Sequence, residues 1–302
     1  MKKNMIYLLA ASILFAIFTG CSKSEKAITS LADVKRAKIG VMTGSTGETI
    51  AAEKFPEAQI KSFDDIMDAV AAIKSGQLDA IVTTYPTALQ VAKKNMEFHY
   101  LPELLDNEDT AIALRKGNDD LLVALNDIIA DLKKDGTLAD MKKRWFKADL
   151  TPYQEMNIDP PKAGKILKIG VSATREPISF VDKDGRISGH DGELARIIAA
   201  RLHRPIEFSN MKFMALIPAL QSGKVDMVIT GMTSTDERKK TVDFTQPYFI
   251  NANVLFVKKA DQSISVVKND RTKLANAGDL KDKRIGVLLG SIHDRYALQT
   301  YP

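Results

Sequence analysis

Apolar positions follow the same order in two separate stretches of the chain, residues 66–83 and 213–230. In each stretch they first recur every three to four residues, as on one face of a helix, and then form an unbroken apolar run. Gly76 and Gly223 separate the two patterns, at the position where glycine commonly ends a helix. Because strands that are apolar on both faces are typical of parallel sheets covered by helices, the chain is predicted to contain α/β units. Pro218 predicts that the second helix starts late or bends.

Small polar residues follow the apolar run in both stretches. Thr84 comes after the first run, and Thr230, Gly231 and Thr233 come after the second. Ligands of open α/β sheets bind at the carboxyl ends of the strands. These hydroxyls and uncovered backbone groups are therefore candidates for a ligand site.

An arginine follows the second group of small residues. Residues 234–237 have the Ser-x-x-Glu spacing of a capping box, which predicts that a helix starts there. Arg238 would then lie in the first helical turn, where the helix dipole disfavours a cation. A ligand carboxylate would match its planar guanidinium group. The alternative is a surface ion pair with Asp236 or Glu237.

A second helix start is predicted at residues 45–48. Ser45 and Glu48 have the spacing of a capping box, and Thr46 lies between them. Free amides at the start of a helix favour an anion. The segment is either part of a ligand site or a plain helix cap.

Further elements are predicted from spacing and composition. Residues 118–134 and 137–146 are expected to be helices, and the proline-rich residues 147–165 are expected to form a linker. Residues 182–185, Asp-Lys-Asp-Gly, have too few liganding positions for a calcium loop and predict a hairpin turn.

The chain also contains an internal repeat. Residues 33–56 align with residues 279–302 without a gap, including the shared Ile-Gly-Val of a predicted strand. The chain is therefore expected to begin a second copy of its first α/β unit. Gly290, Ser291 and Ile292 correspond in this alignment to Gly44, Ser45 and Thr46.

The amino-terminal residues have the features of a secretion signal. Lys2 and Lys3 precede an apolar run over residues 5–18, which is short for a membrane span. Residues 1–20 are predicted to be a signal peptide, with lipid attachment at Cys21. The alternatives are a soluble secreted chain cut nearby and an uncleaved anchor.

Charge and composition exclude several classes of function. The formal net charge is +5 and falls by two when the signal peptide with its two lysines is removed. The lysines are interspersed with acidic residues, so we expect no nucleic-acid partner. The four histidines lack metal-ligand spacing, and we expect no metal or other cofactor. Cys21 is the only cysteine, so no disulfide can form within the chain.

Three segments resemble a known family. Residues 167–202, 218–226 and 225–249, with the G-x-T-x-T-x-E-R run at 231–238, are similar to the first lobe of family 3 extracellular solute-binding proteins, the polar amino acid receptors of ABC transporters. Residues 135–146 resemble the closing segment of that family. The resemblance implies an α/β fold of the type II periplasmic-binding-protein kind, a two-lobed clamshell of parallel or mixed sheets flanked by helices.

The resemblance also implies roles for individual residues. In the family, small residues after the strand bind the amino group of the ligand and the arginine binds its carboxylate. The residues of this chain that match are Thr230, Gly231, Thr233 and Arg238, with Ser45 and Thr46 as a second carboxylate contact on the other lobe.

Several positions depart from the family pattern. Ser172 stands where the family often has an acidic residue, and Thr84 stands where an aspartate often meets the ligand ammonium group. Arg175 replaces an aromatic residue, and it either adds a second cation for a dicarboxylate or projects into solvent. His190 also replaces an aromatic residue, and a packed, uncharged histidine is favoured there over a pH sensor.

The lobes occur in an unusual order. The predicted units are a second-lobe-like unit at 31–115, closing helices at 116–146, a linker at 147–165, a first lobe at 167–258 and the start of a repeated second lobe at 275–302. We expect a permuted clamshell in which Thr46 and Arg238 face one cleft, with hinge strands at 111–115 and 253–258. The alternative is an ordinary receptor that begins at residue 167 and continues after Pro302.

The expected function is binding without catalysis. We expect a lipid-anchored extracytoplasmic receptor, on the bacterial cell membrane or on the periplasmic side of the outer membrane. It would deliver an amino acid or related small carboxylate to an ABC transporter permease. One alternative is the sensory module of a larger membrane receptor or permease fusion, and another is a non-catalytic domain of a peptidoglycan-acting or dehydratase-type enzyme. The sequence contains no nucleophile–base pair or paired carboxylates, so we expect no enzyme activity.

Overall fold

The computed structural model describes residues 28–149 and 151–259. The chain divides into two compact units, Met1–Ala260 and Asp261–Pro302, and all described residues belong to the first. The predictions for Cys21, for residues 1–20 and for residues 275–302, including Gly290, Ser291 and Ile292, lie outside the described residues. No helix in the described part of the chain is long and apolar enough to cross a membrane.

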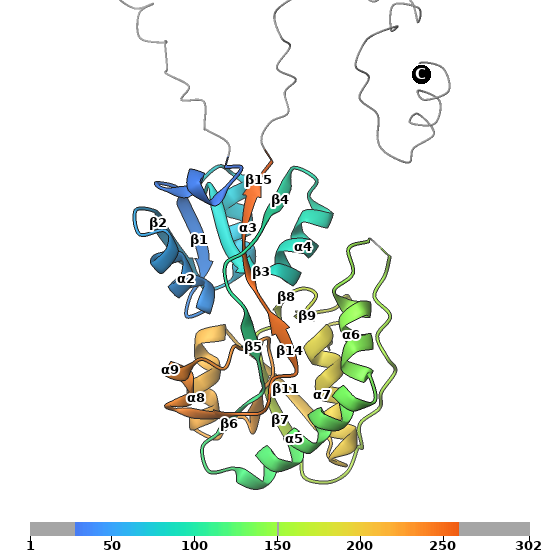
Figure 1. The fold of residues 1–302 in the computed structure, drawn as a ribbon. Coiled ribbons are helices and arrows are strands. Elements are labelled where there is room, and N and C mark those ends of the chain that lie inside the picture. Colours follow the sequence, from blue (N-terminus) through green and yellow to red (C-terminus); the bar gives the residue numbers. More distant parts are fainter. Residues whose placement is uncertain (1–27, 150, 260–302) are drawn as a thin grey trace, which may run out of the picture. The chain divides into compact units, whose positions relative to one another are not determined.

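Lobe A consists of residues 28–105 together with the last strand of the described chain (Figure 1). Its five-stranded sheet has the order β2-β1-β3-β15-β4. The strands are β1 (Lys38–Met42), β2 (Gln59–Phe63), β3 (Ala80–Thr84), β4 (Phe98–Leu104) and β15 (Asn253–Lys258). The helical elements are η1 (Leu31–Val34), α2 (Thr46–Lys54), α3 (Ile66–Lys74) and α4 (Tyr85–Lys94).

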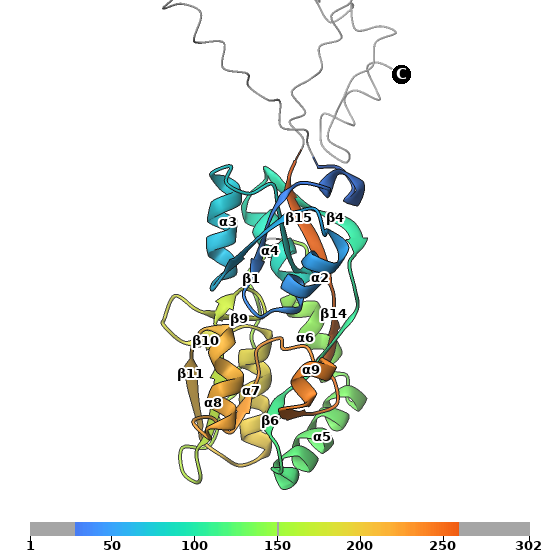
Figure 2. The same ribbon diagram turned by 90° about the vertical axis from the view of Figure 1, so that its left-hand side faces the viewer.

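Helices cover both faces of the lobe A sheet (Figure 2). Ile39 and Val41 of β1 pack in one apolar cluster with Ala51 of α2, whereas Ile81 of β3 packs in another with Ile73 of α3. Successive side chains of a strand point to opposite faces, so the unbroken apolar strands supply both clusters. β1 pairs in parallel with β2 and β3, while β15 is antiparallel to β3 and β4.

Lobe B consists of residues 111–246 and has a sheet of order β11-β7-β12-β6-β13. Its sheet strands are β6 (Ala113–Arg115), β7 (Leu167–Val171), β11 (Ile206–Asn210), β12 (Met227–Val228) and β13 (Val242–Phe244). A smaller sheet contains β8 (Thr174–Arg175), β9 (Ser179–Val181) and β10 (Ile187–Ser188). The helical elements are α5 (Asp119–Lys134), α6 (Thr137–Trp145), α7 (His190–Arg201), η2 (Phe213–Ala215), α8 (Leu216–Gln221) and α9 (Asp236–Lys239). The predicted α/β class with mixed sheets is confirmed.

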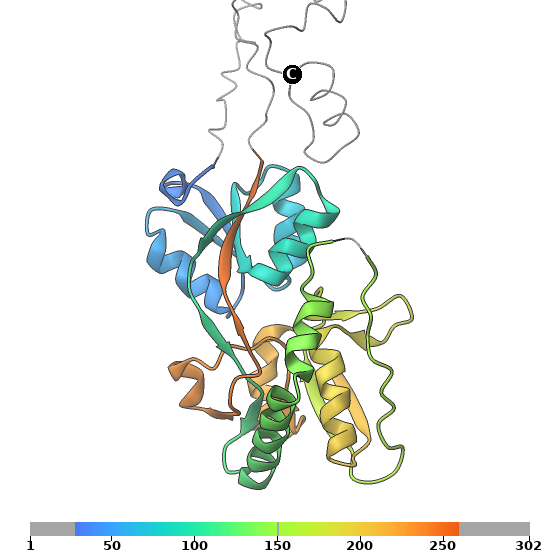
Figure 3. The same ribbon diagram turned by 45° about the vertical axis from the view of Figure 1, so that its right-hand side comes forward.

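The chain crosses between the lobes through β5 (Glu108–Thr110) and β14 (Phe249–Asn251), which pair antiparallel (Figure 3). This placement corrects the predicted lobe and hinge boundaries. Residues 113–115 do not belong to lobe A, because they form β6 between β12 and β13 of lobe B. Residues 253–258 do not belong to lobe B, because they form β15 inside the lobe A sheet. The crossing segments therefore lie one strand away from each predicted hinge.

Several local boundaries also differ from the sequence predictions. The unbroken apolar run at the end of residues 213–230 contains only β12, although its apolar residues are buried as expected for a strand covered on both faces. The helix predicted from residue 234 starts at Asp236, because Thr235 caps it by accepting a hydrogen bond from the Arg238 amide at 3.3 Å. The helix with Pro218 starts late, at Leu216.

The capping box predicted at residues 45–48 forms in a shifted arrangement. Glu48 Oε2 accepts from the Gly44 amide at 2.7 Å, one residue earlier than the pattern requires. Ser45 Oγ donates to the Met42 carbonyl oxygen instead of accepting from the helix. The helix itself starts at Thr46, one residue after Ser45.

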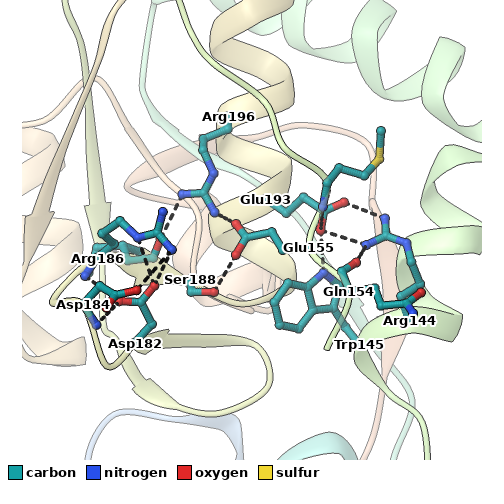
Figure 4. Close-up of polar contacts among 12 residues, drawn as sticks. Arg144, Trp145, Gln154, Glu155, Asp182, Asp184, Arg186, Ser188, Glu193 and Arg196 are labelled. Atoms are coloured by element: carbon teal, nitrogen blue, oxygen red, sulfur yellow. Dashed lines mark hydrogen bonds and ion pairs between the residues drawn. The ribbon is translucent and has the colours of Figure 1, made fainter. Parts of the chain in front are cut away.

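Residues of the predicted linker form hydrogen bonds and an ion pair with lobe B (Figure 4). Glu155 accepts from Ser188 Oγ at 2.8 Å and pairs with Arg196. Arg144 donates to the Gln154 carbonyl oxygen at 2.5 Å and to both carboxylate oxygens of Glu193, at 2.6 and 3.0 Å. The described part of the linker is therefore held against the lobe and does not act as a free spacer.

Candidate functional site

A pocket lies where strand ends of lobe A face loops of lobe B, near the crossing strands. The lining residues of lobe A are Met42, Ser45, Thr46, Ile66, Val82, Thr83, Thr84 and Asn253. Glu108 of β5 lines it together with the lobe B residues Arg175, Phe213, Gly231, Thr233 and Arg238. The parallel strands β1 and β3 end at this pocket, as expected for an open α/β sheet.

Arg238 reaches across the pocket from the first turn of α9. Its Nη1 donates to the Thr233 carbonyl oxygen at 2.8 Å, and its Nη2 donates to the Gly44 carbonyl oxygen of lobe A at 2.9 Å. Its guanidinium carbon lies 5.3 Å from the centre of the Phe213 ring. Burial lowers the pKa of Arg238 to about 10, and nearby Arg175 also lowers it. The group therefore remains a cation at neutral pH.

The alternative of a surface pair for Arg238 does not occur. Asp236 pairs with Lys239 at 3.4 Å, and Glu237 pairs with Lys240. Arg238 is thus turned away from its acidic neighbours and towards the pocket.

Arg175 is buried in the pocket wall and does not project into solvent, which corrects one of its two predicted placements. Only 3% of the residue is exposed, and its Nη2 donates to the Thr230 carbonyl oxygen. Its guanidinium carbon lies 5.5 Å from the centre of the Phe213 ring. Burial lowers its pKa, an effect opposed most strongly by Asp191.

The sequence interpretation missed Glu108, a buried carboxylate at the base of the pocket. Its Oε2 accepts a hydrogen bond from Thr233 Oγ1 at 2.8 Å. The pKa of Glu108 is raised to about 7, mainly by removal from water and in part by the nearby charge of Asp106, against the lowering effect of the hydrogen bonds from Thr46 and Thr233. No spacing marks this residue in the sequence. Its position shortly before the apolar residues 111–114, where a hinge strand was predicted, was the only available signal.

The structure brings most of the predicted site residues together. Ser45, Thr46, Thr84, Arg175, Gly231, Thr233 and Arg238 all line the pocket. Ser172 and Thr230 do not line it, and the Ser172 amide donates to Thr230 Oγ1 at 3.0 Å. This bond ties the end of β7 to the end of β12 and uses the hydroxyl that was expected to meet the ligand.

His190 is a packed residue. It is fully buried, its Nδ1 lies 2.9 Å from Asp191 Oδ1, and its ring stacks on Phe146 and Tyr248. Within residues 28–149 and 151–259, no group of three or more His, Cys, Asp or Glu side chains is placed to hold a metal ion.

Comparison with known proteins identifies the family. Bacterial extracellular solute-binding proteins, family 3, match residues 45–148 and 167–282, which is more than half of the chain. The chain belongs to this family. The predicted resemblance is thereby confirmed, and the match spans both lobes.

Relatives within the family carry different ligand names. The arginine-binding extracellular protein ArtP of Bacillus subtilis is 39% identical over 51% of this chain and 55% of its own length. The probable histidine-binding protein of Campylobacter jejuni is 37% identical over 43% of this chain and 47% of its own length. The L-cystine-binding protein TcyJ of Escherichia coli is 35% identical over 42% of this chain and 48% of its own length. The chain therefore spans about half the length of the curated relatives it matches.

Solved structures match over shorter segments. The arginine-bound form of domain 1 from TmArgBP is 42% identical over 32% of this chain and 82% of that chain, with a TM-score of 0.28. An ancestral arginine-binding protein bound to arginine is 51% identical over 28% and 38%, also with a TM-score of 0.28. The family membership therefore rests on the family match to residues 45–148 and 167–282, and not on these structures.

Proposed function

We propose that this protein captures an α-amino acid outside the cytoplasm and delivers it to the permease of an ABC transporter. The observation that carries the proposal is the position of Arg238, which lines the same pocket as Thr46 of the opposite lobe. An arginine on one lobe and hydroxyl and amide groups on the other can hold one ligand only when both lobes contact it. Binding would therefore favour the closed arrangement of the lobes.

The α-carboxylate is assigned to Arg238. Its guanidinium group has five donors, and only two hydrogen bonds to protein carbonyl oxygens are formed. Thr46 Oγ1 and the start of α2 face it from lobe A. A carboxylate between them would accept hydrogen bonds from the guanidinium group and from the first amides of α2.

The α-ammonium group is assigned to Glu108. Thr84 has no charge to offer an ammonium group, but Glu108 lines the same pocket with a carboxylate. An ammonium group at this position would form a direct ion pair with the buried carboxylate. The relatives named for arginine, histidine and cystine bind ligands that share this zwitterionic group, and this shared chemistry supports the assignment.

Membrane attachment is part of the proposal and rests on the sequence alone. The basic residues, the apolar run and Cys21 have the order of a lipoprotein signal. Replacing Cys21 with serine is expected to move the protein from the membrane fraction to the soluble fraction. Retention of Cys21→Ser in the membrane fraction would refute lipid attachment at this residue.

Isothermal titration calorimetry with a panel of L-amino acids tests the binding function. At least one amino acid is expected to bind the wild-type protein, and Arg238→Met is expected to weaken that binding by about 100-fold, since a charge-assisted contact to a carboxylate is lost. Arg186→Met is the matched control, because Arg186 lies on the exposed β9–β10 turn away from the pocket. Equal affinity of Arg238→Met and the wild type would remove the carboxylate assignment.

A further inference from the structure

Two guanidinium groups share the pocket, and one of them has no role in holding an amino acid backbone. Arg175 and Arg238 both lie against the Phe213 ring, at 5.5 and 5.3 Å from its centre. The only other charged residue that lines this pocket is Glu108. When Glu108 is ionised, the pocket contains two cations and one anion. A ligand with one net negative charge would balance it.

Arg175 has donors that the protein leaves unused. Its one hydrogen bond among the described residues runs from Nη2 to the Thr230 carbonyl oxygen. Its Nε is fully buried and has no hydrogen-bond partner. Buried donors are normally satisfied, and an unsatisfied one is costly. An acceptor from outside the protein would remove this cost.

Asp191 does not use these donors. Its carboxylate has the strongest charge effect on Arg175, but it does not line the pocket. Its Oδ2 accepts from the Gly231 amide and from Tyr248 Oη, the latter at 2.9 Å, and its Oδ1 lies 2.9 Å from His190 Nδ1. Asp191 therefore offsets the charge of Arg175 without lining the pocket, and it leaves the guanidinium donors available to a ligand.

The backbone beside Arg175 also leaves space for it. Gly231 has a φ of +58°, and a Cβ at this position would lie 3.0 Å from Ile178 Cγ2 and 3.5 Å from Arg175 Nη2. A larger residue would strain the turn and crowd the guanidinium group. The absence of a side chain at Gly231 therefore leaves room for the Arg175 guanidinium group at the pocket wall.

We propose that Arg175 binds a second acidic group of the ligand, so that the pocket selects acidic amino acids such as glutamate or aspartate. The inference rests on the proposed function, in which Arg238 holds the α-carboxylate and Glu108 holds the ammonium group. A planar guanidinium group suits a carboxylate because two parallel hydrogen bonds can form. A basic side chain would instead meet a buried cation. The specificity would therefore differ from that of the relatives named for arginine.

The test compares each acid with its neutral amide of the same shape. L-Glutamate is expected to bind the full chain at least about 10-fold more tightly than L-glutamine, and L-aspartate more tightly than L-asparagine, in calorimetric titrations at pH 8. Arg175→Met is expected to abolish this difference, so that the two members of each pair bind with equal affinity. Arg175→Lys keeps the charge and is expected to retain part of the preference. Arg186→Met serves as the control, and circular dichroism melting reports whether each variant folds.

The possible results separate this inference from the proposed function. Equal affinities for glutamate and glutamine, or an unchanged ratio in a folded Arg175→Met variant, would overturn the role of Arg175. Binding of succinate without binding of any amino acid would retain the second acidic group and overturn the ammonium assignment. Binding of glutamine alone would support the proposed function and overturn the acidic preference.

Discussion

Arg238 Nη2 of lobe B donates a 2.9 Å hydrogen bond to the Gly44 carbonyl oxygen of lobe A, although the two residues are 194 positions apart in the chain. Lobe A precedes lobe B in this sequence, whereas the family resemblance implies the reverse order. The pocket nevertheless contains a helix start from lobe A and an arginine from lobe B. The crossing strands β5 and β14, which pair antiparallel, join the two lobes beside it.

The first prediction concerns Gly44, at the contact between the lobes. Its φ is +70°, and a Cβ there would lie 1.8 Å from Met214 Sδ of lobe B. Gly44→Ala is expected to weaken amino acid binding by about 10-fold, because Met214 must move before the lobes can close. It is also expected to lower the free energy of unfolding by about 1 kcal/mol through backbone strain.

Gly76→Ala is the matched control for Gly44→Ala. Gly76 has a φ of +73°, and a Cβ there would have no neighbour within 4 Å. The Gly76→Ala variant should show the same loss of stability as Gly44→Ala in chemical denaturation, and no loss of affinity in calorimetry. An equal loss of affinity in both variants would show that strain, and not lobe contact, is responsible.

The second prediction concerns the pH dependence of binding. Burial raises the pKa of Glu108 to about 7, and only the ionised carboxylate can pair with an ammonium group. Affinity for the bound amino acid is therefore expected to rise by about 10-fold between pH 6 and pH 8. Glu108→Gln is expected to bind more weakly and to show no such rise. A wild-type affinity that is constant over this range would contradict the assignment.

The third prediction concerns the stability of the ligand-free protein. Because the folded-state pKa of Glu108 lies above its ordinary value of 4.5, the folded state holds a proton that the unfolded state releases. The contribution of Glu108 to the free energy of unfolding therefore falls as the pH rises from about 4.5 to 7, by at most about 3 kcal/mol. Glu108→Gln is expected to be the more stable protein at pH 8 in urea titrations. Lower stability of Glu108→Gln at pH 8 would contradict this account.

The fourth prediction concerns the buried ion pair that anchors α6 to α7. Glu193 is fully buried and accepts from Arg144 and from Trp145 Nε1, the latter at 2.9 Å. Glu193→Gln leaves Arg144 without its buried partner and is expected to lower the free energy of unfolding by about 3 kcal/mol. Chemical denaturation measures the change. Glu237→Gln, which removes an exposed pair with Lys240, should leave the unfolding midpoint unchanged.

Repeated apolar spacing predicted two of the helices, but the sequence assigned two strands to the wrong lobe. The helices at 66–74 and 119–134 follow from repeated apolar spacing, and the structure has them as α3 and α5. The strands at 113–115 and 253–258 are mostly apolar, so their composition fits either sheet. Only tertiary pairing decides between the sheets, and pairing cannot be read from spacing.

Local chain order placed some pocket residues correctly, whereas the surroundings of others depend on packing between distant segments. Thr46 and Arg238 were predicted because each lies at a helix start, and both line the pocket. The burial of Arg175 depends on Asp191, Phe213 and the turn at Gly231, which come from separate elements. Such an environment is visible only once the chain has folded.

The most direct test of the central claim is a crystal structure of the protein with the amino acid that binds most tightly in calorimetry. The account predicts that the α-carboxylate lies within hydrogen-bond distance of Arg238 and the start of α2, with the ammonium group against Glu108. A ligand that contacts only one lobe, or that lies outside this pocket, would contradict it.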